Sequence, residues 1–421
     1  MSARTVSGSL VLEGSNPVGN LTKKNHHGWK EKAYVGTVVL PDRISPRGAV
    51  VVDGHRIQSV IDLDKDVIDG RLEILDFGDN YIVPGFIDLH VHGALGKDIM
   101  DADGESLKII TSYQARCGVT GFCGATMSSS GDSIFAAVKT AAESAELSLD
   151  SDILGAYIEG PFFNPNRKGA HDPERIGSMN KEEMYCLLEA AKSLKVIIPL
   201  APEIPRYMRM ISELRNRGVI VAIGHSEATY SQACESFQAG ISHVTHLFNA
   251  MTDFHHREPG IVGAVLDTEQ VTAEIIADGV HVHPSSVRVA VARKGVDRIC
   301  LVTDSVSAAG LGDGLFTAGS SQVFVAGKKA VLKDTQTLAG SVVTMNQAIT
   351  NVLGWSGLSL LQVIKMATLN PSRILGLDSL VGSLEEGKQA NLVILDKKFN
   401  IVRTVLRGEE VYNRNDAGPL G

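Results

Sequence analysis

Short apolar runs alternate with amphipathic stretches over most of the chain. The β-type apolar runs lie near residues 82–90, 119–126, 153–159, 195–201, 219–224, 241–246, 271–277 and 299–303. Between most of them, apolar residues recur three and four apart, which is the spacing of a helix; examples are 105–118, 133–146, 180–195, 206–218 and 286–295. Strand–helix alternation requires parallel strands with crossover helices, and eight such strands close a barrel. The pattern predicts an α/β fold with a catalytic (β/α)8 TIM-type barrel over 82–378.

The regions on either side of the barrel have a different sequence pattern. Short β-branched runs broken by Pro, Gly and Asp fill 33–81 and 379–415. This pattern is typical of small β-sheets with tight turns. We therefore expect one small β-sandwich domain built from both chain ends. Residues 1–32 are rich in Ser, Gly, Asn, Lys and His, which predicts a partly flexible N-terminal extension.

Composition narrows the class of protein. With 421 residues, 44% apolar and 21% charged, the chain can bury a large core, as soluble globular proteins do. A net charge of −8 offers no basic surface for nucleic acid. The five scattered cysteines fit free thiols in the cytoplasm. No run of about 18 apolar residues and no secretory leader pattern is found, so we expect no membrane partner.

Six of the apolar runs end in a carboxylate or a histidine. The residues concerned are His90, His92, Glu159, His225, His246, Asp278, His281 and Asp304. Because the C-terminal ends of barrel strands meet at one face, these side chains are predicted to share one site. Histidine and carboxylate are the ligands that zinc prefers alongside cysteine, so the pattern indicates a metal site at the barrel mouth. Long connections at 247–270 and 305–340 are predicted to hold the substrate.

Each ligand candidate also has a plainer interpretation. His90 and His92 lie two apart in a strand and face the same way, but they could simply cap a strand end. The carboxylate of Glu159 needs a cation, which an arginine or lysine could supply as well as a metal. Taken singly, His225 and His246 are ordinary polar residues. Their matching positions at strand ends favour the metal.

Three further residues are candidates for chemistry or binding. Asp304 suits a general base that takes a proton from water and returns it to a leaving nitrogen, or else an N-cap of a helix. The Ser-Ala-Ala-Gly stretch after it indicates a tight loop instead. His171 lies in a loop and is either exposed or part of the site. Arg257 could bind an anionic substrate by paired hydrogen bonds or remain a solvated charge.

Together these segments resemble the amidohydrolase superfamily. The general features are VPGFIDLHVHG, the strand-end histidines, the strand before Asp304 and the closing GSLEEGKQANLVILD. Within this superfamily, the chain is similar to the N-acetylglucosamine-6-phosphate deacetylase family. The segments that carry this similarity are YIEGPFFNPNRKGAHDPE, IGHSEATY, THLFNAMTDFHHREPGIVGA, IIADGVHVHP, LVTDSVSAAG and LAGSVVTMNQA. The resemblance implies metal-dependent hydrolysis of the acetamide of N-acetylglucosamine 6-phosphate, giving glucosamine 6-phosphate and acetate, in amino-sugar catabolism.

The same resemblance implies roles for individual residues. Glu159, His225 and His246 would hold the main divalent metal, expected to be zinc. Asp304 would be the acid/base, and His171 would polarise the acetamide carbonyl. The substrate would be contacted by Ala170, Asn249, Ala250, Arg257, His281, Leu338, Ala339 and Gly340. In this family the phosphate-binding arginine can come from the neighbouring subunit, which implies a homodimer.

The number of metal ions is a separate question. Some family members have Gln and Asn where this chain has His90 and His92, and those members use one metal. The fourth strand, VIIPLAPE, ends without a lysine that could be carbamylated to bridge two metals. Glu159 would have to bridge instead. We therefore expect one or two ions per subunit, with the second at His90 and His92.

Two alternatives stay open at this point. Another amidohydrolase, such as a cyclic amidase, an adenine deaminase or a dipeptidase, would keep the metal residues but act on an unphosphorylated substrate. Such an enzyme would not need Arg257 in the THLFNAM–REPG loop. A non-catalytic sugar-phosphate binder on the same barrel is opposed by the presence of Asp304 with every metal-ligand candidate.

Overall fold

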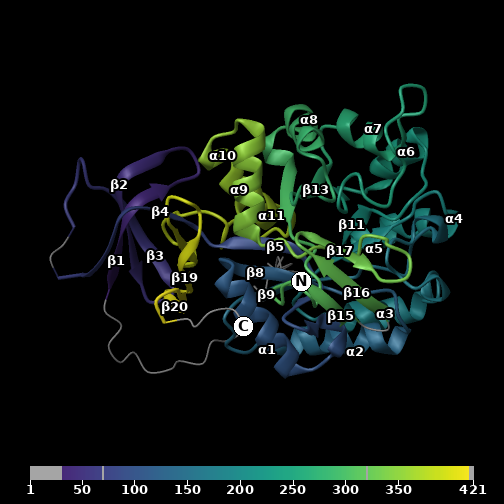
Figure 1. Cartoon of the computed structure of the whole chain (residues 1–421), viewed down its shortest axis with the longest axis horizontal. Coiled ribbons are helices and arrows are strands. Elements are labelled where there is room, and N and C mark those ends of the chain that lie inside the picture. The colour runs from purple at the N-terminus through teal and green to yellow at the C-terminus, as the bar shows by residue number, and fades with distance from the viewer. Residues whose placement is uncertain (1–30, 69–70, 319–320, 417–421) are drawn as a thin grey trace, which may run out of the picture.

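The computed structural model describes residues 31–68, 71–318 and 321–416. Its main body is a sheet of eight parallel strands in the order β14-β13-β12-β11-β10-β9-β8-β5 (Figure 1). The strands are β5 (Phe86–Val91), β8 (Val119–Ala125), β9 (Asp152–Tyr157), β10 (Lys195–Leu200), β11 (Ile220–Ile223), β12 (His243–Val244), β13 (Thr272–Ile276) and β14 (Ile299–Val302). This confirms the predicted TIM-type barrel. The predicted N-terminal extension lies almost wholly outside the described residues, and β1 begins at Lys32.

Helices cover the outside of the barrel. They are α1 (Gly104–Arg116), α2 (Gly131–Ser144), α3 (Lys181–Ala190), α4 (Pro205–Met208), α5 (Ile211–Asn216), α6 (Tyr230–Ala239), α7 (Gly260–Asp267), α8 (Pro284–Lys294), α9 (Met345–Ser356), α10 (Leu360–Met366) and α11 (Leu369–Ile374). Strands covered on both faces show as unbroken apolar runs, and every residue of β5 and β8 is buried. No helix within the described ranges has the length and apolarity to cross a membrane.

A second sheet of seven strands lies beside the barrel, in the order β20-β19-β18-β4-β1-β2-β3. Figure 1 shows it as purple strands from the N-terminal region and yellow strands from the C-terminal region. Its strands are β1 (Lys32–Val39), β2 (Ile44–Asp53), β3 (Arg56–Asp62), β4 (Glu73–Pro84), β18 (Leu392–Leu395), β19 (Ile401–Leu406) and β20 (Glu409–Asn413). Both chain ends build this domain, as expected. The sheet is mixed, because β4 returns parallel to β1 and then pairs with β18.

The connection after β14 is not the plain loop that the sequence indicated. It contains a three-stranded antiparallel sheet, β15 (Gly314–Ala318), β16 (Ser321–Ala326) and β17 (Lys329–Leu332). The inner side of this sheet packs Val323 and Val325 against Val306 and Ala339, in a small apolar cluster of its own. The connection therefore forms a firm wall over the barrel mouth.

Side chains close the barrel where β5 and β14 meet. The fully buried Asp88 carboxylate accepts the backbone N–H of Thr303 at 3.2 Å and its hydroxyl at 2.5 Å. A single parallel bridge then joins Val91 to Ser305. Burial raises the pKa of Asp88 to about 7, although the Thr303 hydroxyl pulls it down. This seam holds the first strand of the barrel beside the strand end that carries Asp304.

Thr303→Val tests the seam, because it removes the hydroxyl donor and keeps the volume of the side chain. A buried acceptor that loses its donor costs about 1–3 kcal/mol, so the urea midpoint of unfolding should fall accordingly. Thr140→Val is the control, since the half-buried Thr140 hydroxyl donates only to Ala102 O at 3.2 Å on the outside of the barrel. Equal midpoints for Thr303→Val and the wild type would contradict the role given to this contact.

Candidate metal and catalytic site

A cavity of about 530 Å³ opens at the C-terminal ends of the barrel strands. The sequence-predicted residues that line it are His92, Glu159, Ala170, His171, His225, His246, Asn249, Ala250, His281, Asp304, Leu338, Ala339 and Gly340. His90 lies below the floor and is fully buried. Arg257 does not line this cavity; it is exposed on the loop between β12 and α7, where its guanidinium contacts His256 at 2.7 Å.

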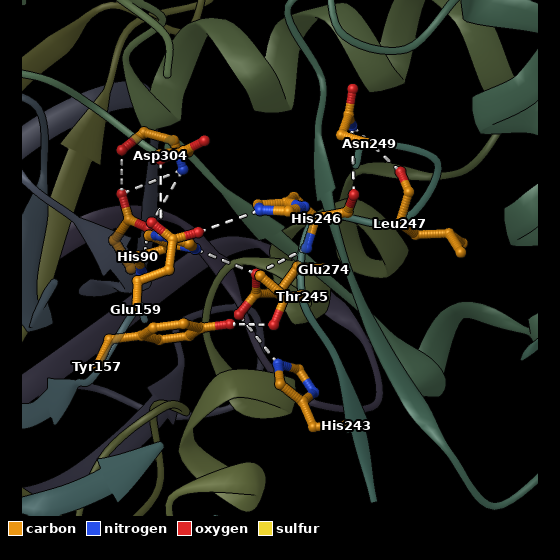
Figure 2. Close-up of polar contacts among 12 residues, drawn as sticks. His90, Tyr157, Glu159, His243, Thr245, His246, Leu247, Asn249, Glu274 and Asp304 are labelled. Carbon is orange, nitrogen blue, oxygen red and sulfur yellow. Dashed lines mark hydrogen bonds and ion pairs between the residues drawn. The ribbon is translucent and has the colours of Figure 1, made fainter. Parts of the chain in front are cut away.

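Glu159 stands at the centre of the site; Figure 2 shows it close to His90, with its carboxylate directed toward His246. Its Oε1 lies 3.2 Å from His225 Nε2 and 3.1 Å from His246 Nε2. Its Oε2 lies 3.0 Å from His92 Nε2 and 3.5 Å from His90 Nε2. The two oxygens of one carboxylate thus face two separate pairs of histidines.

Within each pair the ring nitrogens converge. His90 Nε2 and His92 Nε2 are 3.2 Å apart, and His225 Nε2 and His246 Nε2 are 3.1 Å apart. Asp304 adds Oδ1 at 3.3 Å from His92 Nε2. Lone pairs directed at one another in a buried space require a cation between them, which is either a proton or a metal ion. Imidazole nitrogens and carboxylate oxygens are zinc ligands, so this set of residues fits a divalent metal.

Neighbouring groups determine which ring nitrogen is free. His225 Nδ1 donates to the carbonyl of Arg167 at 2.7 Å, so the neutral ring directs its lone pair from Nε2 toward Glu159. His171 has the opposite arrangement, because its Nδ1 accepts the backbone N–H of Ser128 at 3.1 Å. The neutral His171 ring therefore carries its hydrogen on Nε2, 3.2 Å from Glu159 Oε2. In this arrangement His171 presents a hydrogen-bond donor to the site, although its ring also lies close enough to Glu159 and His225 to join them in a group that could hold a metal ion.

Charge is balanced within the cluster. Burial opposes ionisation of Glu159, but His90, His171 and His225 together outweigh it and hold the pKa of that carboxyl well below its usual range. Burial also disfavours charge on His92, yet Asp304 and Glu159 raise its pKa to about 9. For His225 burial dominates and lowers the pKa to about 4. A metal ion would displace the protons that otherwise supply the positive charge.

The backbone turns sharply at the site residues. Glu159, His225, His246 and Asp304 each lie two positions beyond the last residue of β9, β11, β12 and β14, respectively. Three of them adopt left-handed φ, at 50° for His225, 26° for His246 and 49° for Asp304. Such conformations cost a non-glycine residue about 1–3 kcal/mol and cluster at functional sites. The strained turns direct these side chains inward while the chain leaves the barrel.

Sequence reasoning missed a layer of polar residues below the site. Glu274 of β13 and His243 of β12 are fully buried and bond to each other at 3.0 Å. Tyr157 stacks on His90 with ring centroids 4.2 Å apart. The signal for Glu274 was a single carboxylate inside the apolar run TAEIIA, and its partners are distant in sequence. His281 was predicted, and its Nδ1 is held by Asp278 at 2.7 Å.

Glu159→Gln should remove metal from the site, because the amide lacks the charge and turns one ligand oxygen into a donor. We expect the zinc content after loading and desalting to fall at least about tenfold, measured by elemental mass spectrometry. Glu203→Gln is the matched control, since this carboxylate lies near the same face but bonds to Asn164 and Ser226. Wild-type zinc content in Glu159→Gln would exclude Glu159 as a ligand.

Known proteins place these features in a family. The amidohydrolase family model matches residues 81–411. The chain is 34% identical over 387 residues to the N-acetylglucosamine-6-phosphate deacetylase of Bacillus subtilis (strain 168), covering 91% of this chain and 97% of that protein. It is 36% identical over 329 residues to the N-acetylgalactosamine-6-phosphate deacetylase of Escherichia coli O157:H7, covering 78% and 87%. A mutant N-acetyl-D-glucosamine-6-phosphate deacetylase from Mycobacterium smegmatis, solved with N-acetyl-D-glucosamine-6-phosphate, matches with a TM-score of 0.86 at 29% identity, covering 91% of this chain and 100% of that one. The chain belongs to the amidohydrolase family, in the branch whose members include these deacetylases.

Proposed function

We propose that the protein hydrolyses the acetamide of N-acetylglucosamine 6-phosphate to glucosamine 6-phosphate and acetate, in amino-sugar catabolism. The observation that carries this proposal is that Glu159, Asp304 and His171 line one cavity, with His171 Nε2 3.2 Å from Glu159 Oε2. Glu159 would be a metal ligand, Asp304 the base, and His171 the hydrogen-bond donor to the substrate carbonyl. The similarity to deacetylases over most of the chain favours this substrate class over a cyclic amidase, an adenine deaminase or a dipeptidase.

The cofactor we propose is zinc, with one or two ions per subunit. Glu159, His225 and His246 would hold the first ion. His90 and His92 would hold the second, with Glu159 shared, which the separate directions of its two oxygens support. When bound, zinc supplies Lewis acidity, which lowers the pKa of water at such sites from 15.7 toward about 7.

Asp304 would move the proton. Burial opposes its ionisation, but His90 and His92 outweigh this and lower its pKa, so the carboxylate is free to act as a base near neutral pH. It accepts the proton of the water whose oxygen attacks the acetamide carbon. As the carbon–nitrogen bond breaks, Asp304 returns that proton to the amine and acetate leaves. His171 Nε2–H would donate to the carbonyl oxygen as negative charge develops there.

Substrate contacts would come from two subunits. Ala170, Asn249, Ala250, His281, Leu338, Ala339 and Gly340 line the cavity of this chain and are proposed to contact the sugar phosphate. Arg257 is proposed to bind the phosphate of a neighbouring subunit in a homodimer. Its exposure on a loop outside this chain's own cavity, three residues from the 61% exposed Phe254, supports that assignment.

We propose that the enzyme is cytoplasmic, because its cysteines are free thiols, which are typical of a reducing compartment.

Acetate release tests the function directly. Chelator-treated and zinc-reloaded protein would be compared on N-acetylglucosamine 6-phosphate, its 4-epimer N-acetylgalactosamine 6-phosphate, and unphosphorylated N-acetylglucosamine. We expect turnover only after reloading, and fastest on the first substrate. Preference for the 4-epimer would move the assignment to the activity named for the E. coli relative. No acetate from either sugar phosphate would overturn the proposal.

Asp304→Asn should reduce kcat about 10²–10⁴-fold, since the amide cannot carry the proton. Asparagine tolerates left-handed φ, so the backbone at this position is preserved. Zinc content and the thermal midpoint, measured on the same sample, should stay close to wild type. Full activity in Asp304→Asn would exclude it as the acid/base.

Arg257→Ala should raise KM for the phosphorylated sugar about 10–100-fold, because a hydrogen bond to a charged group contributes about 1.5–3 kcal/mol. KM for the unphosphorylated sugar should not change. Arg293→Ala is the control, an exposed arginine on α8 that pairs with Asp267 at 3.2 Å. If the wild type hydrolysed the phosphorylated and the unphosphorylated sugar at equal rates, that result would contradict the phosphate-binding role of Arg257. It would favour an amidohydrolase that acts on unphosphorylated substrates.

A further inference from the structure

A fully buried carboxylate lies between two histidines under the floor of the site. Figure 2 shows Glu274 above His243 and close to His246. Glu274 Oε1 lies 3.0 Å from His243 Nε2, and Oε2 lies 3.3 Å from His90 Nδ1. Oε2 also accepts the backbone N–H of His246 at 3.0 Å. Glu274, His90 and His243 are all 0% exposed, so these contacts are shielded from water.

The contacts fix the state of the His90 ring. Glu274 Oε2 already accepts a backbone N–H, and its Oε1 faces an imidazole nitrogen, so both oxygens of the carboxylate stand next to hydrogen-bond donors. An ionised carboxylate only accepts hydrogen bonds, so His90 Nδ1 must carry the hydrogen. The neutral ring then has its lone pair on Nε2. That atom faces His92 Nε2 at 3.2 Å and Asp304 Oδ1 at 3.6 Å.

The ring is also held against rotation. Tyr157 stacks on His90 at 4.2 Å, and its own hydroxyl is bonded to Thr245 at 2.7 Å. Stacking fixes the plane of the His90 imidazole, and the contact with Glu274 fixes which ring edge, the one with Nδ1, points away from the cavity. His243 Nδ1 bonds in turn to the Thr272 hydroxyl at 2.8 Å, which fixes the His243 ring and, through it, the position of Glu274. Packing alone would not require a charged group on this edge, because an apolar side chain could support the ring.

We infer that Glu274 is a positioning residue for the second metal site of the proposed deacetylase, an inference that rests on that proposed function. Its anionic oxygen keeps the hydrogen of His90 on Nδ1 and directs the Nε2 lone pair into the space shared with His92 and Asp304. Carboxylates behind ligating histidines orient the ring and raise its basicity. His243 holds Glu274 in place and does not reach the site.

Glu274→Gln tests this, because glutamine keeps the shape of the side chain and removes its charge. Zinc would be titrated calorimetrically into chelator-treated wild type and variant. The wild type should bind two ions, and in Glu274→Gln the weaker ion should bind about 10–100-fold less tightly while the tighter one is unchanged. Asp152→Asn is the control, a partly buried carboxylate at the start of β9 that pairs with Arg407 at 2.9 Å. It should bind both ions as the wild type does.

Unchanged binding of both ions by Glu274→Gln would overturn the inference. So would an equal loss of both ions, because Glu274 would then serve the barrel as a whole. A wild type that binds one ion would also overturn it, while acetate release by that one-zinc protein would leave the proposed function intact. If the variant does not fold, ¹⁵N-histidine NMR of the zinc-loaded wild type decides. It should show a His90 proton on Nδ1, and a proton on Nε2 would overturn the inference.

Discussion

The site is organised by one carboxylate that faces five imidazole rings. Glu159 is almost completely buried, and leaving such a charge unpaired would cost several kcal/mol. Its two oxygens are satisfied from opposite sides, by His225 and His246 on one and by His90 and His92 on the other. The arrangement holds only if positive charge is shared among them. The strained strand ends, the fixed ring tautomers and the carboxylate under the floor all serve this requirement.

The interior of the barrel is accordingly divided into layers. Part of it is apolar, formed by residues that share the register of Tyr157, His243 and Glu274 and therefore point inward, such as Ile197, Ala222 and Cys300. Directly beneath the cavity the barrel is polar, with Glu274 and His243 bonded across neighbouring strands. Such a layer is stable only when every member is satisfied. It gives the histidines above it a rigid base, which loops alone would not supply.

The sequence predicted the barrel well because parallel strands buried on both faces appear as unbroken apolar runs. It also predicted the residues that gather at the mouth, since every strand end points to the same face. Other features depend on contacts that no local pattern carries. Which ring nitrogen of His171 carries the hydrogen follows from the backbone of Ser128, 43 residues away. Glu274 has its partner His90 184 residues distant. The sheet β15–β17 was read as a loop because its strands are short and half exposed.

The left-handed residues at the strand ends have a consequence for how this chain can change. At His225, His246 and Asp304 glycine would suit the backbone better than any side chain does. Substituting glycine there would relieve the backbone strain, but it would also leave the buried Glu159 carboxylate without its partners. A descendant barrel freed from catalysis would therefore gain stability only by losing Glu159 together with these side chains. Left-handed side chains around a buried carboxylate are thus a local record of activity, readable in a single chain without reference to its relatives.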